Sequence, residues 1–340
     1  MWKSTGGPMS IEISAFDDPE AWNEYVEGSS VGTLFHRYEL LEAAEGHAAA
    51  RLYPLIGHKG QEPVGLFPAF EISKGGVSTV FSPPPGLAIP FQGPVPLNDG
   101  KLRRRKAERR NRRFVEGCLE WLEERLSPRY YRICTPVGYE DPRPFTWNEY
   151  DTSPLHTYRL AIDEEPEMLK GSFSKSLRRY LDPDDGDRFV VEERGEDAIK
   201  FVHEQVRARY EAQGKTYTVP LEYLLELYET LPAGTVRPYV ATVEGELASG
   251  IVSLEDGSTI YFSEGGGKPD VEYPLNDLLH WEIIRDARAR GVETYDLCGA
   301  NTPRICAYKS KFNPELCTYY EAEKGTVLLN TAANLYKKYR

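Results

Sequence analysis

Apolar residues recur with a helical period near the end of the chain, from Leu275 to about residue 290. Their spacings of three and four predict one buried helix face, made of Leu275, Leu278, Leu279, Ile283 and Ala287. Glu282 falls on that same face. Asn276, just after Pro274, is a candidate N-cap, and Gly291 is a natural stop after the last turn.

A short strand is expected directly after this helix, over residues 293–298. It ends at Gly299 and Ala300, where a backbone without bulky side chains can come close to a ligand. The cationic and aromatic run 307–312 follows it. We therefore expect the chemistry of the protein in this part of the chain.

The first half of the chain predicts helices, a meander of strands, a long helix and one further strand. The expected elements are helices at 18–27 and 37–45, strands at 51–56, 64–72 and 78–81, a helix with its apolar stripe over 115–126, and a strand at 130–134. A proline-rich loop at 82–96 separates the third strand from the long helix.

The second half repeats this order after a proline-rich connector at 136–154. The expected elements are a strand at 157–162, a helix at about 166–181, a strand at 188–192, helices at 196–213 and 220–231, and strands at 236–243, 247–254 and 258–263, before the helix at 275–290. The same order occurring twice predicts two similar α/β modules in tandem, with mixed sheets.

Composition fits a globular protein of 340 residues, long enough for two cores. No apolar run approaches the roughly 20 residues of a membrane helix, and the N-terminus lacks a signal-peptide pattern, so a cytoplasmic location is expected. The five cysteines are scattered without a CxxC pair, which predicts neither a metal site nor a disulfide framework.

Charge is distributed unevenly along a chain whose net charge is −12. Residues 103–113 hold eight cations in eleven positions, spread around the predicted helix. Arg104, Arg109 and Arg112 are the candidates for binding nucleic-acid phosphates, which such a patch would neutralise without reading sequence. A solvated helix end in an acidic protein explains the run equally well.

Several short motifs together resemble the FemAB-like acyltransferases of the GNAT superfamily, over nearly the whole chain. They are Leu34-Phe35-His36-Arg37, the basic stretch 172–179, Leu278-Leu279-His280-Trp281-Glu282, Tyr295-Asp296-Leu297, and Tyr308-Lys309-Ser310-Lys311-Phe312. The resemblance implies two GNAT-like modules, at 1–154 and 155–321, with the segment 322–340 folding back onto the first module. It also implies a cleft between the modules, transfer of an acyl or aminoacyl group to an amine, and an aminoacyl-tRNA donor in one branch of the family.

Lys309 is the main catalytic candidate, with Tyr308 beside it. An amine attacking an acyl ester or thioester generates an oxyanion, which a fixed cation stabilises. The resembling family has an aromatic–lysine pair before a later phenylalanine, which Tyr308, Lys309 and Phe312 match. Without that resemblance, Lys309 and Lys311 are better explained as solvated residues of a surface helix.

Glu282 is the second catalytic candidate. A carboxylate on the apolar side of a helix loses hydration, so its pKa should rise, which suits a group that accepts a proton from an amine. A salt bridge to a nearby arginine is the equal alternative. His280 is expected at the surface.

Other polar residues are candidates for substrate binding. Lys175, Arg178 and Arg179 share a helical face that suits a phosphate or carboxylate, or that is simply solvated beside the acidic loop 182–187. His36, Asn276 and Asp296 complete the set, although Asp296 is expected to be buried and hydrogen-bonded and not catalytic.

The donor stays open between aminoacyl-tRNA and acyl-CoA. The loop Gly265-Gly266-Gly267-Lys268 precedes a helix, as diphosphate-binding loops do, but it stands about eight residues ahead and lacks the usual GNAT spacing. Three glycines also suit a plain flexible turn.

Two functions from different classes follow. The first is an acyltransferase or aminoacyltransferase that uses no permanent cofactor and acts on a small-molecule or peptide amine, with its acceptor in the cleft between the modules. The second is a catalytically inactive protein with two GNAT-like modules that binds a ligand, for which RNA bound through the run 103–113 is one candidate. The sequence leaves the oligomeric state open.

Overall fold

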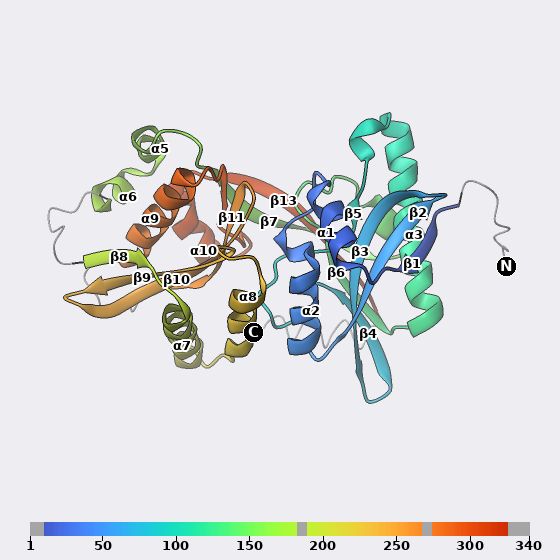
Figure 1. Cartoon of the computed structure of the whole chain (residues 1–340), viewed down its shortest axis with the longest axis horizontal. Helices are drawn as coiled ribbons and strands as arrows, with labels where there is room; N and C mark the ends of the chain where they lie inside the picture. The colour runs from blue at the N-terminus through green and yellow to red at the C-terminus, as the bar shows by residue number, and fades with distance from the viewer. Residues whose placement is uncertain (1–9, 182–188, 267–273, 326–340) are drawn as a thin grey trace. The chain divides into compact units, whose positions relative to one another are not determined.

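The structure, a computed structural model, describes residues 10–181, 189–266 and 274–325. These residues form two compact units (Figure 1). One unit takes the chain up to Leu155 and again from Thr318, and the other runs from His156 to Cys317. Each unit combines helices with a mixed sheet, so the predicted α/β class is confirmed.

The first unit has a sheet in the order β1-β2-β3-β4-β6-β13, in which β4 and β6 run parallel and the other neighbours antiparallel. Its elements are β1 (Glu12–Ala15), α1 (Pro19–Glu27), the 3₁₀ turn η1 (Leu34–His36), α2 (Tyr38–His47), β2 (Arg51–Lys59), β3 (Glu62–Lys74), β4 (Val77–Ser82), β5 (Val95–Pro96), the 3₁₀ turn η2 (Asp99–Lys101), α3 (Arg104–Leu126), β6 (Tyr130–Cys134), α4 (Arg143–Trp147) and β13 (Glu315–Gly325). Residues Glu321–Gly325 of β13 pair with β6.

Two glycines allow α3 to lie close to this sheet. Gly57 of β2 and Gly65 of β3 face each other, and the ring of Phe114 in α3 lies over both. A β-carbon would come within 2.6 Å of that ring at Gly57 and 2.4 Å at Gly65. The close contact buries Phe114 completely and fixes the long helix on the core.

The second unit has a sheet in the order β7-β12-β11-β10-β9-β8, in which β11 and β12 run parallel and the other neighbours antiparallel. Its elements are β7 (Asp151–Ala161), α5 (Pro166–Ser172), α6 (Lys175–Tyr180), β8 (Phe189–Glu193), α7 (Glu196–Ala212), α8 (Leu221–Thr230), β9 (Val236–Val243), β10 (Glu246–Asp256), β11 (Thr259–Gly265), α9 (Leu275–Ala289), β12 (Thr294–Asp296), α10 (Pro303–Lys309) and the 3₁₀ turn η3 (Ser310–Phe312).

Helices α9 and α7 cover opposite faces of this second sheet (Figure 1). The predicted apolar stripe of α9, including Leu279 and Ile283, is buried against Tyr295 and neighbouring strand residues. On the other face Val202 of α7 lies so close to Gly250 that a β-carbon there would be 2.5 Å away. Residues of α7 and of the first turn of α9 line one pocket, where the candidate functional site lies.

Three expectations about local structure were wrong. The single helix at 166–181 is two helices, because the chain turns at Phe173 and Ser174 caps α6 by accepting a hydrogen bond from the Leu177 N–H at 3.3 Å. Strand β1 precedes the first expected helix at a place where no element was expected, and α4 lies in the expected connector at 136–154. Among the described residues, no helix combines the length and apolar character needed to cross a bilayer.

Candidate functional site

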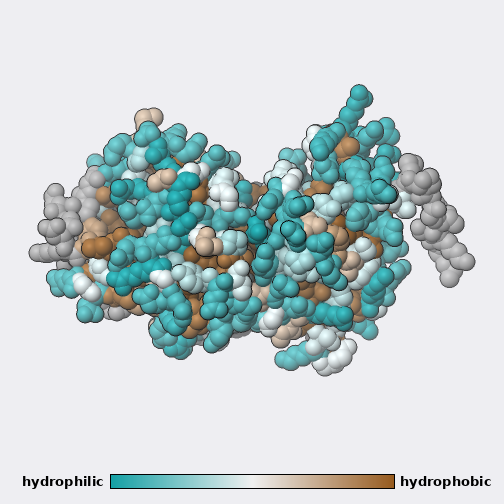
Figure 2. Space-filling model, viewed as in Figure 1, coloured by the Kyte–Doolittle hydropathy of each residue, from teal (hydrophilic) through white to brown (hydrophobic). Residues whose placement is uncertain are grey.

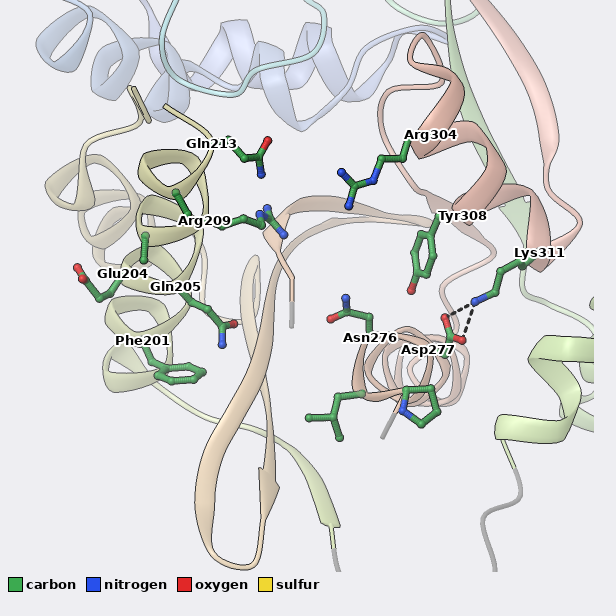
Figure 3. A pocket seen from close by; sticks show the side chains of 14 residues that line it. Phe201, Glu204, Gln205, Arg209, Gln213, Asn276, Asp277, Arg304, Tyr308 and Lys311 are labelled. Atoms are coloured by element: carbon green, nitrogen blue, oxygen red, sulfur yellow. Dashed lines mark hydrogen bonds and ion pairs between the residues drawn. The ribbon is translucent and has the colours of Figure 1, made fainter. Parts of the chain in front are cut away.

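A pocket of about 980 Å³ lies entirely within the second unit (Figure 3). One wall is α7, with Gln205 and Arg209. The opposite wall is the first turn of α9 together with α10 and η3, and it carries Asn276, Asp277, Arg304, Tyr308 and Lys311. Sequence analysis picked out Asn276 and Tyr308 from this set.

Two buried polar atoms of the lining residues lack hydrogen-bond partners in the described part of the chain. They are the hydroxyl of Tyr308 and the Oε1 of Gln205, whose Nε2 donates to the carbonyl of Ala248 at 3.0 Å. The Tyr308 hydroxyl points down toward Asp277 (Figure 3). Burial and the nearby charge of Asp277 raise the pKa of Tyr308, so the hydroxyl keeps its proton at neutral pH. Unsatisfied groups of this kind are typical of ligand sites.

The walls of the pocket carry charges of both signs. Arg209 and Arg304 extend toward each other from opposite walls (Figure 3). Below them the Lys311 ammonium binds both oxygens of Asp277, at 2.9 and 2.7 Å. Asp277 is only 4% exposed, although it stands in the first turn of α9. A helix start favours negative charge, so this carboxylate already occupies the natural anion position.

A second acidic group, Glu264, lies behind Arg209. The pairing of β10 with β11 shifts between Val252 and Ser253, which forms a β-bulge after Phe262. Because of this bulge, the side chains of Phe262 and Glu264 point to opposite faces of the sheet, although residues two apart in a regular strand share one face. Phe262 packs on His280 of α9, whereas Glu264 turns toward Tyr217 and Arg209. Burial raises the pKa of Glu264 to about 7, and the Tyr217 hydroxyl and the Arg209 charge oppose that rise.

Lys309 does not line the pocket. Its ammonium donates to three backbone carbonyls: Leu297 at 2.7 Å, Gly299 at 3.2 Å, and Cys298 between them. The residue is 8% exposed, and burial lowers its pKa. All three ammonium hydrogens are therefore engaged in holding the turn after β12. The alternative of two solvated lysines is wrong for both Lys309 and Lys311.

Glu282 lies on α9 at the edge of the buried face. Its carboxylate accepts a hydrogen bond from Arg285 at 2.9 Å, and burial raises its pKa despite that arginine. It is not among the residues lining the pocket. His280 is buried and not at the surface as expected, because its ring packs on Phe262 and Phe312, and its Nδ1 shares a hydrogen bond with the Tyr295 hydroxyl at 2.9 Å.

Asp296 is fully buried, and its oxygens are occupied by protein groups. Thr157 donates to Oδ1 at 2.5 Å, the Cys298 N–H donates to the same oxygen, and Arg159 donates to Oδ2 at 2.9 Å. Asn276 is not the N-cap of α9, because the helix begins at Leu275 after Pro274. Its Oδ1 instead accepts a hydrogen bond from Ser249 at 3.0 Å, and its side chain lines the pocket.

The remaining candidates lie outside the pocket. His36 is fully buried in the first unit, where burial lowers its pKa to about 4 and Thr33 bonds its Nδ1. Lys175, Arg178 and Arg179 are exposed on α6. On α3, Arg104 and Arg112 pair with Glu108 and Glu116 one turn away, and Arg109 is exposed.

Only the first two glycines of the glycine loop, Gly265 and Gly266, belong to the described residues. Gly267 and Lys268 lie outside the described residues. Gly266 lies against the Arg209 guanidinium, since a β-carbon there would be 1.7 Å from a terminal nitrogen. The Asp277 carboxylate at the start of α9 is paired with Lys311, and Arg209 and Arg304 line the same pocket. The described residues also include no group of His, Cys, Asp and Glu able to hold a metal ion.

Comparison with known proteins agrees with this architecture. The family model described as acetyltransferase (GNAT) domain matches residues 171–310. Residues 171–310 form a GNAT domain. This GNAT domain contains α7, β9–β11, α9, β12 and α10, and with them every described residue that lines the pocket except Lys311. No curated protein sequence matches the chain.

Solved structures resemble the whole chain, including the first unit. A crystal structure of FemX superposes with a TM-score of 0.70 at 12% identity, covering 91% of this chain and 96% of FemX. A tandem GNAT protein from the clavulanic acid biosynthesis pathway gives 0.54 at 14% identity, covering 93% and 99%. The structure of L-PGS from Bacillus licheniformis gives 0.59 at 12% identity, covering 97% and 99%. The chain thus has the FemAB-like tandem GNAT fold.

Sequence reasoning missed Gln205, Arg209, Arg304 and Glu264. Gln205 and Arg209 stand four residues apart beside the apolar stripe of α7, so the helical pattern places them together at the edge of a buried face. Arg304 and Glu264 left no comparable signal, because their positions depend on the fold and on the bulge in β11.

Proposed function

We propose that this protein is an N-acyltransferase or aminoacyltransferase that moves an activated acyl group to an amine, with the reacting group held in the pocket of the GNAT domain. The observation that carries the proposal is the Tyr308 hydroxyl, which is buried beside Asp277, protonated at neutral pH and directed into the pocket. Such a group can donate a proton to a leaving oxygen.

The transfer forms a bond between the amine nitrogen and the acyl carbon. The bond between that carbon and the oxygen of the donor ester breaks, the amine loses a proton, and the leaving oxygen gains one. Tyr308 supplies the proton to the leaving oxygen and recovers one from solvent. Asn276 and Gln205 have hydrogen-bonding groups near the same space and would orient the acyl group.

An aminoacyl ester suits this pocket better than acyl-CoA does. The loop ahead of α9 lacks the usual GNAT spacing for binding a diphosphate, and Asp277 and Glu204 on the walls are each paired with a cation of the protein, Lys311 and Arg207. Arg209 and Arg304 can bind the phosphates of the nucleic-acid end that carries the ester. We therefore propose aminoacyl-tRNA as the donor and a small-molecule or peptide amine as the acceptor.

We assign Lys309 a positioning role and not direct contact with the oxyanion. Its ammonium holds the carbonyls of Leu297, Cys298 and Gly299, and the next residue back along α10 is Tyr308. Holding that turn fixes the start and end of α10 relative to β12, which places the Tyr308 ring in the pocket.

A single-turnover assay with three donors tests the proposal. The chain is mixed with labelled aminoacyl-tRNA, an aminoacyl-adenosine ester or acyl-CoA, each with a pool of amine acceptors, and amide formation is measured. We expect product from the two esters and none from acyl-CoA. Product from acyl-CoA alone would overturn the donor assignment, and binding without product from any donor would favour the inactive binding protein.

A further inference from the structure

An exposed tryptophan stands beside the arginine-rich start of α3 in the first unit. Trp147, the last residue of α4, has 52% of its surface exposed. The guanidinium carbons of Arg112 and Arg143 lie 5.3 and 5.4 Å from the centre of its ring. Two cations thus flank an exposed aromatic ring, an arrangement that can bind a ligand with both a flat ring and negative charge.

This surface is rigid. Phe145 of α4 is completely buried in the core of the unit, and Asn111 of α3 donates to the carbonyl of Asp141 at 3.3 Å. The Tyr139 hydroxyl donates a hydrogen bond to the Oδ1 of the same Asn111 side chain at 3.0 Å. Because both helices are anchored in this way, the indole and the arginines keep their relative positions, and little ordering entropy is lost on binding.

The charge of the surface is positive in an acidic chain. Eight cations lie within residues 103–113; those at 103–106, 109, 112 and 113 are exposed, whereas the Arg110 side chain is only 9% exposed and pairs with Glu62. Glu108, Glu116 and Asp141 neutralise part of this charge through ion pairs. The remaining excess suits a polyanion.

A flexible nucleic acid fits this surface better than an anionic membrane does. Insertion into lipid needs a broad apolar helix face, but the apolar stripe of α3 from Phe114 to Leu122 is buried in its own core. The surface over the upper end of this unit, where α3 begins, is mostly hydrophilic (Figure 2). One exposed indole can stack on a base, and it cannot anchor a protein in lipid.

We propose that Trp147, Arg112, Arg143 and the exposed start of α3 bind single-stranded RNA, with one unpaired base stacked on the indole and the neighbouring phosphates bound by arginines. Base stacking on an aromatic side chain contributes about 1–3 kcal/mol, which corresponds to roughly 5- to 150-fold in affinity. The phosphate contacts make the binding salt-dependent. This inference is independent of the proposed acyl donor, since it concerns only the first unit.

The test is fluorescence anisotropy of the full chain with a labelled single-stranded RNA of about ten nucleotides, a length within the usual site size. Trp147→Ala should weaken binding about tenfold, and Trp147→Phe should recover most of it. Replacing Arg104, Arg109 and Arg112 together by Gln should lower the slope of log affinity against log salt by about 2. Arg125→Gln, which removes a cation lying 4.2 Å from the Trp121 ring at the other end of α3, should change nothing.

Two further probes separate stacking from charge. A sulfated polysaccharide has the charge without bases, so Trp147→Ala should not weaken its binding. Vesicles rich in phosphatidylglycerol should bind more weakly than RNA. Equal RNA binding by wild type and Trp147→Ala would overturn the proposal, and so would vesicle binding that exceeds RNA binding. The triple Gln variant decides the phosphate contribution separately, because its exposed substitutions leave the core intact.

Discussion

Lys311 binds both carboxylate oxygens of Asp277, at 2.9 and 2.7 Å, and thereby ties η3 to the first turn of α9. Asp277 is almost completely buried, while Lys311 also lies 4.7 Å from the centre of the Tyr308 ring. The ion pair thus holds together the wall of the pocket that carries Tyr308. The ion pair between Lys311 and Asp277 is therefore structural, and the position of Tyr308, the proposed proton donor, depends on it.

Breaking this ion pair should destabilise the protein. Lys311→Met removes the cation and leaves the Asp277 carboxylate buried without its partner, which should cost about 2–3 kcal/mol because the lysine side chain is partly exposed. Chemical denaturation of the two proteins measures the loss. Asp277→Asn in the Lys311→Met background should restore much of the stability, and additive losses in the double variant would contradict a direct coupling.

Tyr308→Phe should reduce turnover and spare stability. The substitution removes a proton donor whose contribution is typically about two orders of magnitude in rate. The neighbouring Asp277 carboxylate keeps its ion pair with Lys311 when the hydroxyl is removed, so the thermal midpoint should change little. Single-turnover amide formation and a melting curve check both expectations. Full turnover in this variant would remove Tyr308 from the mechanism.

Lys309→Met distinguishes a positioning role from direct catalysis. Loss of the ammonium leaves the carbonyls of Leu297, Cys298 and Gly299 without their shared donor, so the thermal midpoint should fall, with a stability loss of about 2 kcal/mol. Lys309→Arg should recover little, because a planar guanidinium does not match three converging carbonyls. An unchanged midpoint together with a large loss of turnover would instead favour the oxyanion role that the sequence suggested.

The periodic patterns of the sequence predicted most of the fold correctly. The apolar stripe of α9 and the long helix α3 stand where the spacing places them, because a helix face buried against a sheet must repeat every three to four residues. The order of elements led to the tandem GNAT fold. The break between α5 and α6 was missed. It involves only two residues, Phe173 at the end of α5 and Ser174 at the start of α6, and so it barely disturbs the helical pattern of the sequence.

The site was harder to predict than the fold. Tyr308 and Asn276 were predicted because they stand in or beside recognisable motifs. The direction in which Lys309 points was not, since it depends on where the turn after β12 presents its carbonyls. Glu264 was invisible for a similar reason: a one-residue bulge decides which face of the sheet it occupies. Side-chain direction at such positions is a property of the folded backbone.

Glu264 should make stability depend on pH in a defined direction. Burial raises its pKa from the ordinary 4.5 to about 7. Below pH 4.5 the carboxyl is protonated in both states and carries no penalty. Between pH 4.5 and 7 the unfolded chain releases this proton more readily than the native protein, so native stability is lost as the pH rises. The full effect is about 3 kcal/mol.

Glu264→Gln keeps the shape of the side chain and removes its titration, so the variant should gain stability relative to wild type as the pH rises from 5 to 8. Denaturation at each pH and constant ionic strength measures this difference. Burial lowers the pKa of His36 to about 4 and that of His280 to about 3, and these residues destabilise the native state as the pH falls. They act equally in both proteins, so they cancel in the comparison. A difference in stability that is the same at pH 5 and pH 8 would show that Glu264 does not titrate in this range.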